Sequence, residues 1–242
     1  MSMFPDSQAR TRPIELDYGT DNRAVFNFFN AVYAWMFVGL AVTAAVGFFV
    51  SQSPTMLQTL YGNGKFGIIA LVLGAWVVAW GAQKAALQIS AAAGTVLFLV
   101  YAAIIGAMLS GIFIVYPAST LLAAFVLTAG TFGAMSLYGY VTKRDLTTIG
   151  SYLVMAAIGL FLASIVNVFI ASDGLSWLIT YAVLAVFIGL TAYETQKLRN
   201  LALEYGHDPQ LASRLAVCGS IVLYISFINI FVSILRIIGG RR

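Results

Sequence analysis

Residues 85–142, AALQISAAAGTVLFLVYAAIIGAMLSGIFIVYPASTLLAAFVLTAGTFGAMSLYGYVT, form the longest stretch of the chain without a charged residue. The stretch counts 58 residues. An α-helix needs only about 20 apolar residues to cross the roughly 30 Å of hydrocarbon in a bilayer. The stretch is therefore long enough for two membrane helices. Pro117 divides them, because proline cannot continue a helix but is tolerated where one begins.

The whole chain shares this scarcity of charge. Lys and Arg number 13 and Asp and Glu number 9 among 242 residues, so 9% of the chain is charged, against roughly 25% in an average soluble domain. Hydrophobic residues make up 61%. A soluble protein could not cover its surface with so few charges. Disordered, collagen-like and coiled-coil chains are excluded by the same numbers, and the single Cys218 excludes an internal disulfide framework.

The remaining uncharged gaps complete a set of seven predicted membrane helices. They are continuous apolar runs, so the sequence predicts an all-α membrane protein, a seven-helix bundle, and not a barrel of alternating strands. Residues 1–23 are polar and are expected to form a disordered tail without a signal peptide. The expected helices cover about 26–50, 66–83, 91–114, 118–141, 147–171, 175–196 and 212–238.

The positions of Lys and Arg in the short loops predict the orientation. Nine of them fall in the N-terminal tail and the even-numbered loops, whereas the odd-numbered loops hold only Lys65. Because short cytoplasmic loops are enriched in these residues, the N-terminus is expected in the cytoplasm. Arg236, Arg241 and Arg242 would then lie outside. Either the last segment is re-entrant or the other charges outweigh these three, and a full span is the preferred interpretation.

Small residues recur at four-residue spacing in several predicted helices. Such rows allow close helix packing in a membrane, where lipid provides no hydrophobic drive for association. We interpret them as packing surfaces without chemical function. The rows are Gly39, Thr43 and Gly47; Gly106 and Ser110; Ala129 and Gly133; and Gly130 and Ala134.

Glu194 is the one acidic residue inside a predicted membrane helix. A charge in hydrocarbon is costly, so such a residue usually faces the bundle interior and marks a functional site. The carboxylate could then change its charge with pH or with ion binding. The alternative is that Glu194 sits at the cytoplasmic end of its helix and simply pairs with Lys197.

The last predicted helix carries a second set of polar residues. Ser226, Asn229, Ser233 and Arg236 share one helical face. Such a face is expected against other helices or along a water-filled path, not against lipid. The alternative interpretation is hydrogen bonding between helices, worth about 1 kcal/mol or less per pair.

Other kinds of site lack the residues they need. His207 is the single histidine and falls in a polar loop, so no histidine-based metal site or catalytic dyad is expected within the membrane. No lysine follows Lys197, which excludes a retinal Schiff base in the last helix. We expect no enzymatic activity, no cofactor and no nucleic-acid partner.

Three longer motifs occur in a fixed order: residues 128–146 (TAGTFGAMSLYGYVTKRDL), 190–198 (LTAYETQKL) and 223–237 (LYISFINIFVSILRI). They resemble the fourth helix and following loop, the Tyr-Asp-Thr-Gln signature and the last helix of bacterial Bax inhibitor-1 family proteins. The resemblance covers about residues 24–242. It implies an inner-membrane bundle whose last helix is central.

The resemblance also implies a pH-sensitive calcium leak gated by two aspartates, one in each of the last two helices. The first aspartate corresponds to Glu194 and the second to Ser226. A basic latch residue of the family corresponds to Lys84. Two close carboxylates titrate as a coupled pair, whereas Glu194 beside Ser226 cannot. We therefore expect a path for calcium or other cations with weak or altered pH gating, in which Asn229 and Arg236 also line the route.

A different role is implied by other family members. Bacterial relatives restrain a membrane-bound AAA protease, and eukaryotic members oppose cell death. For such a role the N-terminal tail and the sixth loop, about 197–213, would be the contact elements, and no pore is needed.

Overall fold

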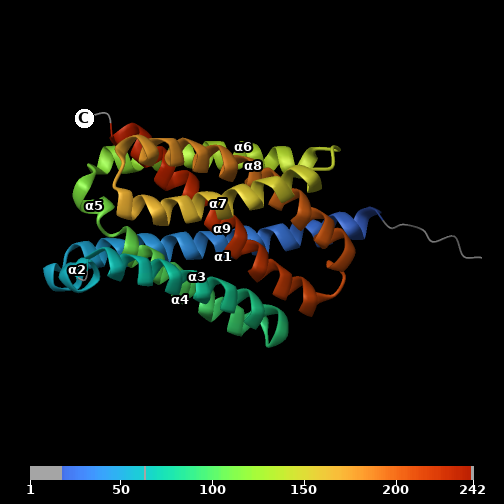
Figure 1. Ribbon diagram of the computed structural model, residues 1–242. Coiled ribbons are helices and arrows are strands. Elements are labelled where there is room, and N and C mark those ends of the chain that lie inside the picture. Colours follow the sequence, from blue (N-terminus) through green and yellow to red (C-terminus); the bar gives the residue numbers. More distant parts are fainter. Residues whose placement is uncertain (1–17, 63, 241–242) are drawn as a thin grey trace, which may run out of the picture.

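The computed structural model describes residues 18–62 and 64–240, and every regular element within these residues is a helix. Seven helical spans are long and apolar enough to cross a membrane, with α4 and α5 together forming the third. This confirms the predicted all-α membrane bundle (Figure 1). The helices are α1 (Tyr18–Ser51), α2 (Pro54–Tyr61), α3 (Gly64–Gln88), α4 (Ala91–Leu109), α5 (Ile112–Val115), α6 (Ala118–Val141), α7 (Thr147–Ile170), α8 (Asp173–Tyr205) and α9 (Pro209–Gly239).

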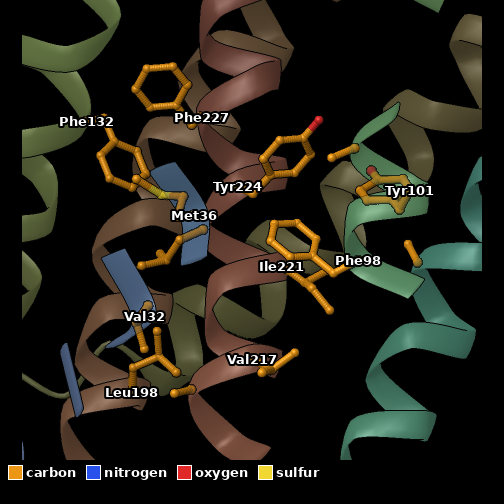
Figure 2. Packing of buried hydrophobic residues seen from close by; sticks show 14 of the residues in the cluster. Val32, Met36, Phe98, Tyr101, Phe132, Leu198, Val217, Ile221, Tyr224 and Phe227 are labelled. Carbon is orange, nitrogen blue, oxygen red and sulfur yellow. The ribbon is translucent and has the colours of Figure 1, made fainter. Parts of the chain in front are cut away.

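The last helix, α9, is the centre of the bundle. It packs against α1, α3, α4, α6 and α8, and Figure 1 shows it crossing the middle of the molecule. Tyr224, fully buried, forms edge-on ring contacts with Phe98 at 5.4 Å and Tyr101 at 5.7 Å. Phe227 contacts Phe132 at 5.5 Å between ring centroids. Figure 2 shows these rings on both sides of α9, and the contacts of α9 with five other helices confirm the expected central last helix.

Small residues bring α1 and α4 together as predicted. A methyl group added at Gly39 would lie 2.4 Å from the Phe98 ring, and one at Gly106 would lie 2.5 Å from the main-chain oxygen of Thr43. The Thr43 hydroxyl lies 2.9 Å from the Ala102 carbonyl oxygen and 2.6 Å from the Tyr224 hydroxyl. Thr43 donates to a carbonyl and accepts from Tyr224, so the pair ties α1 to both α4 and α9.

The predicted packing role of the small residues in α6 is wrong. A methyl group added at Gly130 or Gly133 would meet no atom of the described chain within 4 Å. The helix instead packs through the row Thr128, Phe132 and Ser136, which is buried against α8 and α9. Since this larger row already fills the space beside the central helix, the small row faces outward.

The largest difference from the predicted boundaries is in α8, which continues to Tyr205 instead of ending near residue 196. Charged residues end the hydropathy signal there but not the helix, because Lys, Arg, Leu and Ala favour helical backbone. The helix stops where the Gly206 N–H bonds the Ala202 carbonyl, and Asp208 then caps α9. The predicted loop at 197–213 is therefore a tight corner between two helices.

The first helix begins earlier than predicted, and the last helix is unbroken. Residues 18–23, expected in the disordered tail, form the first turns of α1, and residues 1–17 lie outside the described residues. The last span is one continuous helix of 31 residues, which matches the full span and not the re-entrant segment.

Contacts gather four parts of the chain at one end of the bundle. Ala24, near the start of α1, lies beside Gly206 at the α8–α9 corner. Arg214 donates hydrogen bonds to the carbonyls of Leu87 and Ile89, which end α3. Gln196 bonds the α6–α7 loop. These contacts place the even-numbered loops together, as alternating membrane helices require.

Candidate functional site

Glu194 of α8 and Ser226 of α9 line the same cavity. It has a volume of about 190 Å³ and lies between α7, α8 and α9. Its remaining walls are apolar and come from all three helices: Val154, Ala157, Ile158, Phe187, Leu190, Val222 and Ile225. The structure thus brings together the two residues that were expected from the sequence to form the gating pair.

The Glu194 side chain is 14% exposed, and its carboxylate lies 4.0 Å from the Lys197 Nζ. The two expected situations therefore occur together, since the acid faces a cavity and also has a cation one turn away. Lys197 is 54% exposed, and an exposed ion pair of this length contributes little to stability. Glu194 is 21 residues from the start of α8, or about 32 Å along the axis, near the edge of the hydrocarbon on the side of the α8–α9 corner.

The residues after Glu194 fix the rotation of α8. The Thr195 hydroxyl lies 3.1 Å from that of Ser136 on α6, which in turn bonds the Tyr33 hydroxyl on α1. The side-chain oxygen of Gln196 accepts from the Leu146 N–H at 2.8 Å, and its amide donates to a carbonyl in the same loop at 2.7 Å. With these two faces bound, the Glu194 face must point toward α7 and α9.

Two glycines set the helix spacing around this segment. A methyl group at Gly139 of α6 would lie 2.2 Å from the main-chain oxygen of Ala192. One at Gly150 of α7 would overlap the Tyr193 ring at 2.2 Å. Both glycines, like Thr195, Gln196 and their partners, were not identified as site residues from sequence. For Gly139, Thr195 and Gln196 the available signal was their position inside the family-like motifs, whereas Gly150 lies outside these motifs.

The polar face of α9 does not line one path. Of its four residues only Ser226, 2% exposed, belongs to the cavity with Glu194. The Asn229 side chain donates to the Ile225 carbonyl within α9 at 2.8 Å, and Ser233 is buried. Arg236 donates to the Ser176 hydroxyl of α8 at 2.6 Å. Of these three residues, Arg236 makes the bond between helices that the alternative interpretation expected, whereas the Asn229 bond stays within α9.

Lys84, the expected latch residue, is not part of the cavity. It is an exposed residue near the end of α3, with its ammonium 3.9 Å from the centre of the Trp80 ring. Trp80 lies one turn earlier on the same helix, and the Lys84 ammonium forms its cation–π contact there and not with a residue of α8.

The cavity is not built to hold a resident divalent ion. No group of three His, Cys, Asp or Glu side chains is close enough to bind a metal within residues 18–62 and 64–240. Calcium takes six to eight oxygen ligands, while the cavity offers one carboxylate and one hydroxyl. The chemistry available is therefore exchange of a proton or transient contact with a cation.

Comparison with known proteins covers nearly the whole chain. A family model described as "Inhibitor of apoptosis-promoting Bax1" matches residues 25–242. Inner membrane protein YbhL of Escherichia coli K12 is 40% identical over 243 aligned positions, covering 100% of both chains. An uncharacterized protein of Borreliella burgdorferi is 37% identical over 215 positions, covering 89% of this chain and 92% of its own. An uncharacterized membrane protein of Streptococcus pyogenes is 32% identical over 221 positions, covering 88% and 92%.

The match includes all seven spans and the three motifs that resembled the family, with Glu194 and Ser226 among them. The chain belongs to the Bax inhibitor-1 family.

Proposed function

We propose that this protein is a cation leak pathway of the bacterial inner membrane in which Glu194 responds to protons or cations. The observation that supports it is the cavity shared by Glu194 and Ser226, lined by three membrane helices. The YbhL relative is named an inner membrane protein, and we assign this chain to the same membrane. Calcium is the proposed permeant ion.

The proposed orientation places the N-terminus in the cytoplasm. The end of the bundle where α1 begins also holds the turns that follow α3, α6 and α8. Its described basic residues are Arg23, Lys84, Lys143, Arg144, Lys197, Arg199 and Arg214. This clustering supports a cytoplasmic position, because positive charges are retained on that side.

The single carboxylate determines the proposed pH response. Two adjacent acids would bind protons in two coupled steps, with one pKa strongly raised by the neighbouring charge. Ser226 supplies a hydroxyl in place of the second acid, so the site has one titrating group. The flux is therefore expected to change gradually with pH, and one negative charge attracts a divalent cation less strongly than two.

Calcium flux into liposomes tests the proposal. The protein is reconstituted in vesicles that contain a calcium-sensitive dye, and flux is recorded over a pH series. We expect Glu194→Gln to abolish the pH dependence. Glu204→Gln is the matched control, because Glu204 is an exposed acid on the same helix outside the cavity. Absence of flux at every pH, or an unchanged profile in Glu194→Gln, would contradict the proposal.

A second variant tests the role of the missing acid. Ser226→Asp places a carboxylate beside Glu194, so the pH profile should split into two steps, with the upper step at higher pH than in the unaltered protein, because each negative charge makes the other acid harder to deprotonate. Ser226→Asn is the control of similar size without charge. If the Ser226→Asp profile overlays that of the unaltered protein, the coupled-carboxylate reasoning is wrong.

A second candidate function is restraint of a membrane-bound AAA protease. The observation in its favour is the extension of α8 past residue 196, where Leu203 is 44% and Tyr205 37% exposed. Recovery of a stoichiometric protease from native membranes would support this role. The interaction should survive deletion of residues 1–17 and be lost in a Leu203→Ser, Tyr205→Ser double variant. If the Leu203→Ser, Tyr205→Ser double variant bound the protease as well as the unaltered protein does, the assignment to this surface would be refuted.

A further inference from the structure

A long apolar groove runs between α1 and α6, with α9 as its floor. Two hollows of about 320 and 520 Å³ share the lining residues Leu40, Phe125 and Phe227, so they form one continuous depression. We call it the α1–α6 groove. Both helices pack on α9 but make few direct contacts with each other. The groove is separate from the Glu194 cavity, which lies beside α7.

The groove opens toward the surrounding lipid. Its rims carry large apolar side chains that point outward: Phe26, Phe37, Leu122 and Leu137 are 63–68% exposed. On α1 the larger hollow extends from Phe26 to Leu40, about 21 Å of helix. This length exceeds half of the roughly 30 Å hydrocarbon core, so the hollow can take an acyl chain from one leaflet along its length.

Positive charge lies at the cytoplasmic end of the groove. Tyr140 lines this end and contacts Phe29 of α1 at 5.3 Å between ring centroids. The guanidinium of Arg199 lies 5.6 Å from the centre of the Tyr140 ring. Lys143, in the loop after α6, and Arg23, near the start of α1, are exposed at the same end of the bundle. Cations at this level attract the headgroups of acidic lipids.

We propose that the α1–α6 groove binds an anionic phospholipid, with one acyl chain between the two helices and the headgroup phosphate near Arg199. The outward-facing rims favour a lipid because nothing else in the hydrocarbon region is as abundant. The basic end selects a negatively charged headgroup. The proposal does not depend on ion conduction.

Photolabelling tests the site with two matched variants. The protein is reconstituted with a trace of phosphatidylglycerol that carries a diazirine in its acyl chain, irradiated and digested for mass spectrometry. Adducts are expected on α1 and α6 peptides that line the groove. Gly133→Leu should fill the groove and reduce them, while Gly130→Leu should not. Neither glycine has an atom of the described chain within 4 Å of an added methyl group, but only Gly133 lines the groove.

The headgroup is tested by comparing labelled phosphatidylglycerol with labelled phosphatidylcholine. Arg199→Gln should lower the preference for the anionic lipid about fivefold. Lys84→Gln is the control, since Lys84 is an exposed cation on α3 away from the groove. Circular dichroism and gel filtration establish that each variant is folded.

Three outcomes would overturn the proposal. Adducts spread evenly over exposed helices such as α7 would show that the groove is ordinary lipid-facing surface. Equal labelling by the two lipids in the unaltered protein would remove the headgroup assignment. A dimer that is disrupted by Gly133→Leu but not by Gly130→Leu would identify the occupant as a second copy of the chain.

Discussion

Gly139→Ala is expected to destabilise the bundle beside the Glu194 cavity. The added methyl carbon would lie 2.2 Å from the main-chain oxygen of Ala192, and the two helices must move apart by more than about 1 Å to restore ordinary contact. Forced separation of this kind costs about 1–3 kcal/mol. Ala192→Gly gives no rescue, because the obstructing atom belongs to the main chain.

Gly130→Ala is the matched control for this change. It lies on the same helix, α6, and has open space around the added methyl group within the described chain. Both variants gain the same helix propensity, up to about 1 kcal/mol, so their difference isolates the helix contact. Thermal unfolding in detergent should show Gly139→Ala melting about 2–12 °C below Gly130→Ala. Equal melting temperatures would refute the close approach of α6 and α8.

Three further predictions concern contacts outside the cavity. Gln196→Leu removes both side-chain bonds to the α6–α7 loop, so hydrogen exchange in that loop should accelerate roughly 5- to 150-fold. Unchanged exchange rates would mean that other contacts hold the loop. Thr43→Val leaves the buried Tyr224 hydroxyl without its acceptor and should lower the free energy of unfolding in detergent by about 1–3 kcal/mol. Tyr224→Phe should lower it less, by roughly 0.5–1.5 kcal/mol. The reverse order would contradict the assignment of Tyr224 as the donor. The hydrogen bonds to Thr147 hold the pKa of Asp145 below its usual value. Their contribution to folding stability is therefore present above the unfolded pKa of about 3.9 and is lost as pH falls through the lower, folded value. The difference in unfolding temperature between Asp145→Ala and the unaltered protein should close in that acidic range, and a constant difference would argue against the linkage.

The membrane helices were predictable because charge is so scarce that its positions mark most boundaries. The same reasoning failed where a helix continues beyond the hydrocarbon, as α8 does through Lys197 and Arg199 to Tyr205. Hydropathy reports the solvent around a segment, whereas helix ends are decided by capping residues such as Gly206 and Asp208.

The candidate site was only partly predictable. A lone acid in a membrane helix pointed to Glu194, and the family resemblance pointed to Ser226. Their shared cavity also depends on Thr195 and Gln196, whose partners lie 59 and 50 residues away in the chain. Sequence separation of that size leaves no local pattern to detect. The small-residue rule likewise cannot say whether a row faces inward, because the small rows of α6 have the same spacing as those of α1 and α4 and yet face outward.

The central position of α9 has a consequence for how the protein is made. Of the seven described spans this helix is synthesised last, and residues 209–242, which contain it, number 34. At about 5–20 residues per second, the first six spans therefore wait about 2–7 s in the membrane without their common core. During that interval the Thr43 hydroxyl and the Phe98 ring lack their α9 partner, Tyr224. A chain that terminates before Pro209 would keep six insertable helices yet have nothing to assemble around, so a nonsense mutation near the end should be as damaging to the folded protein as one near the start.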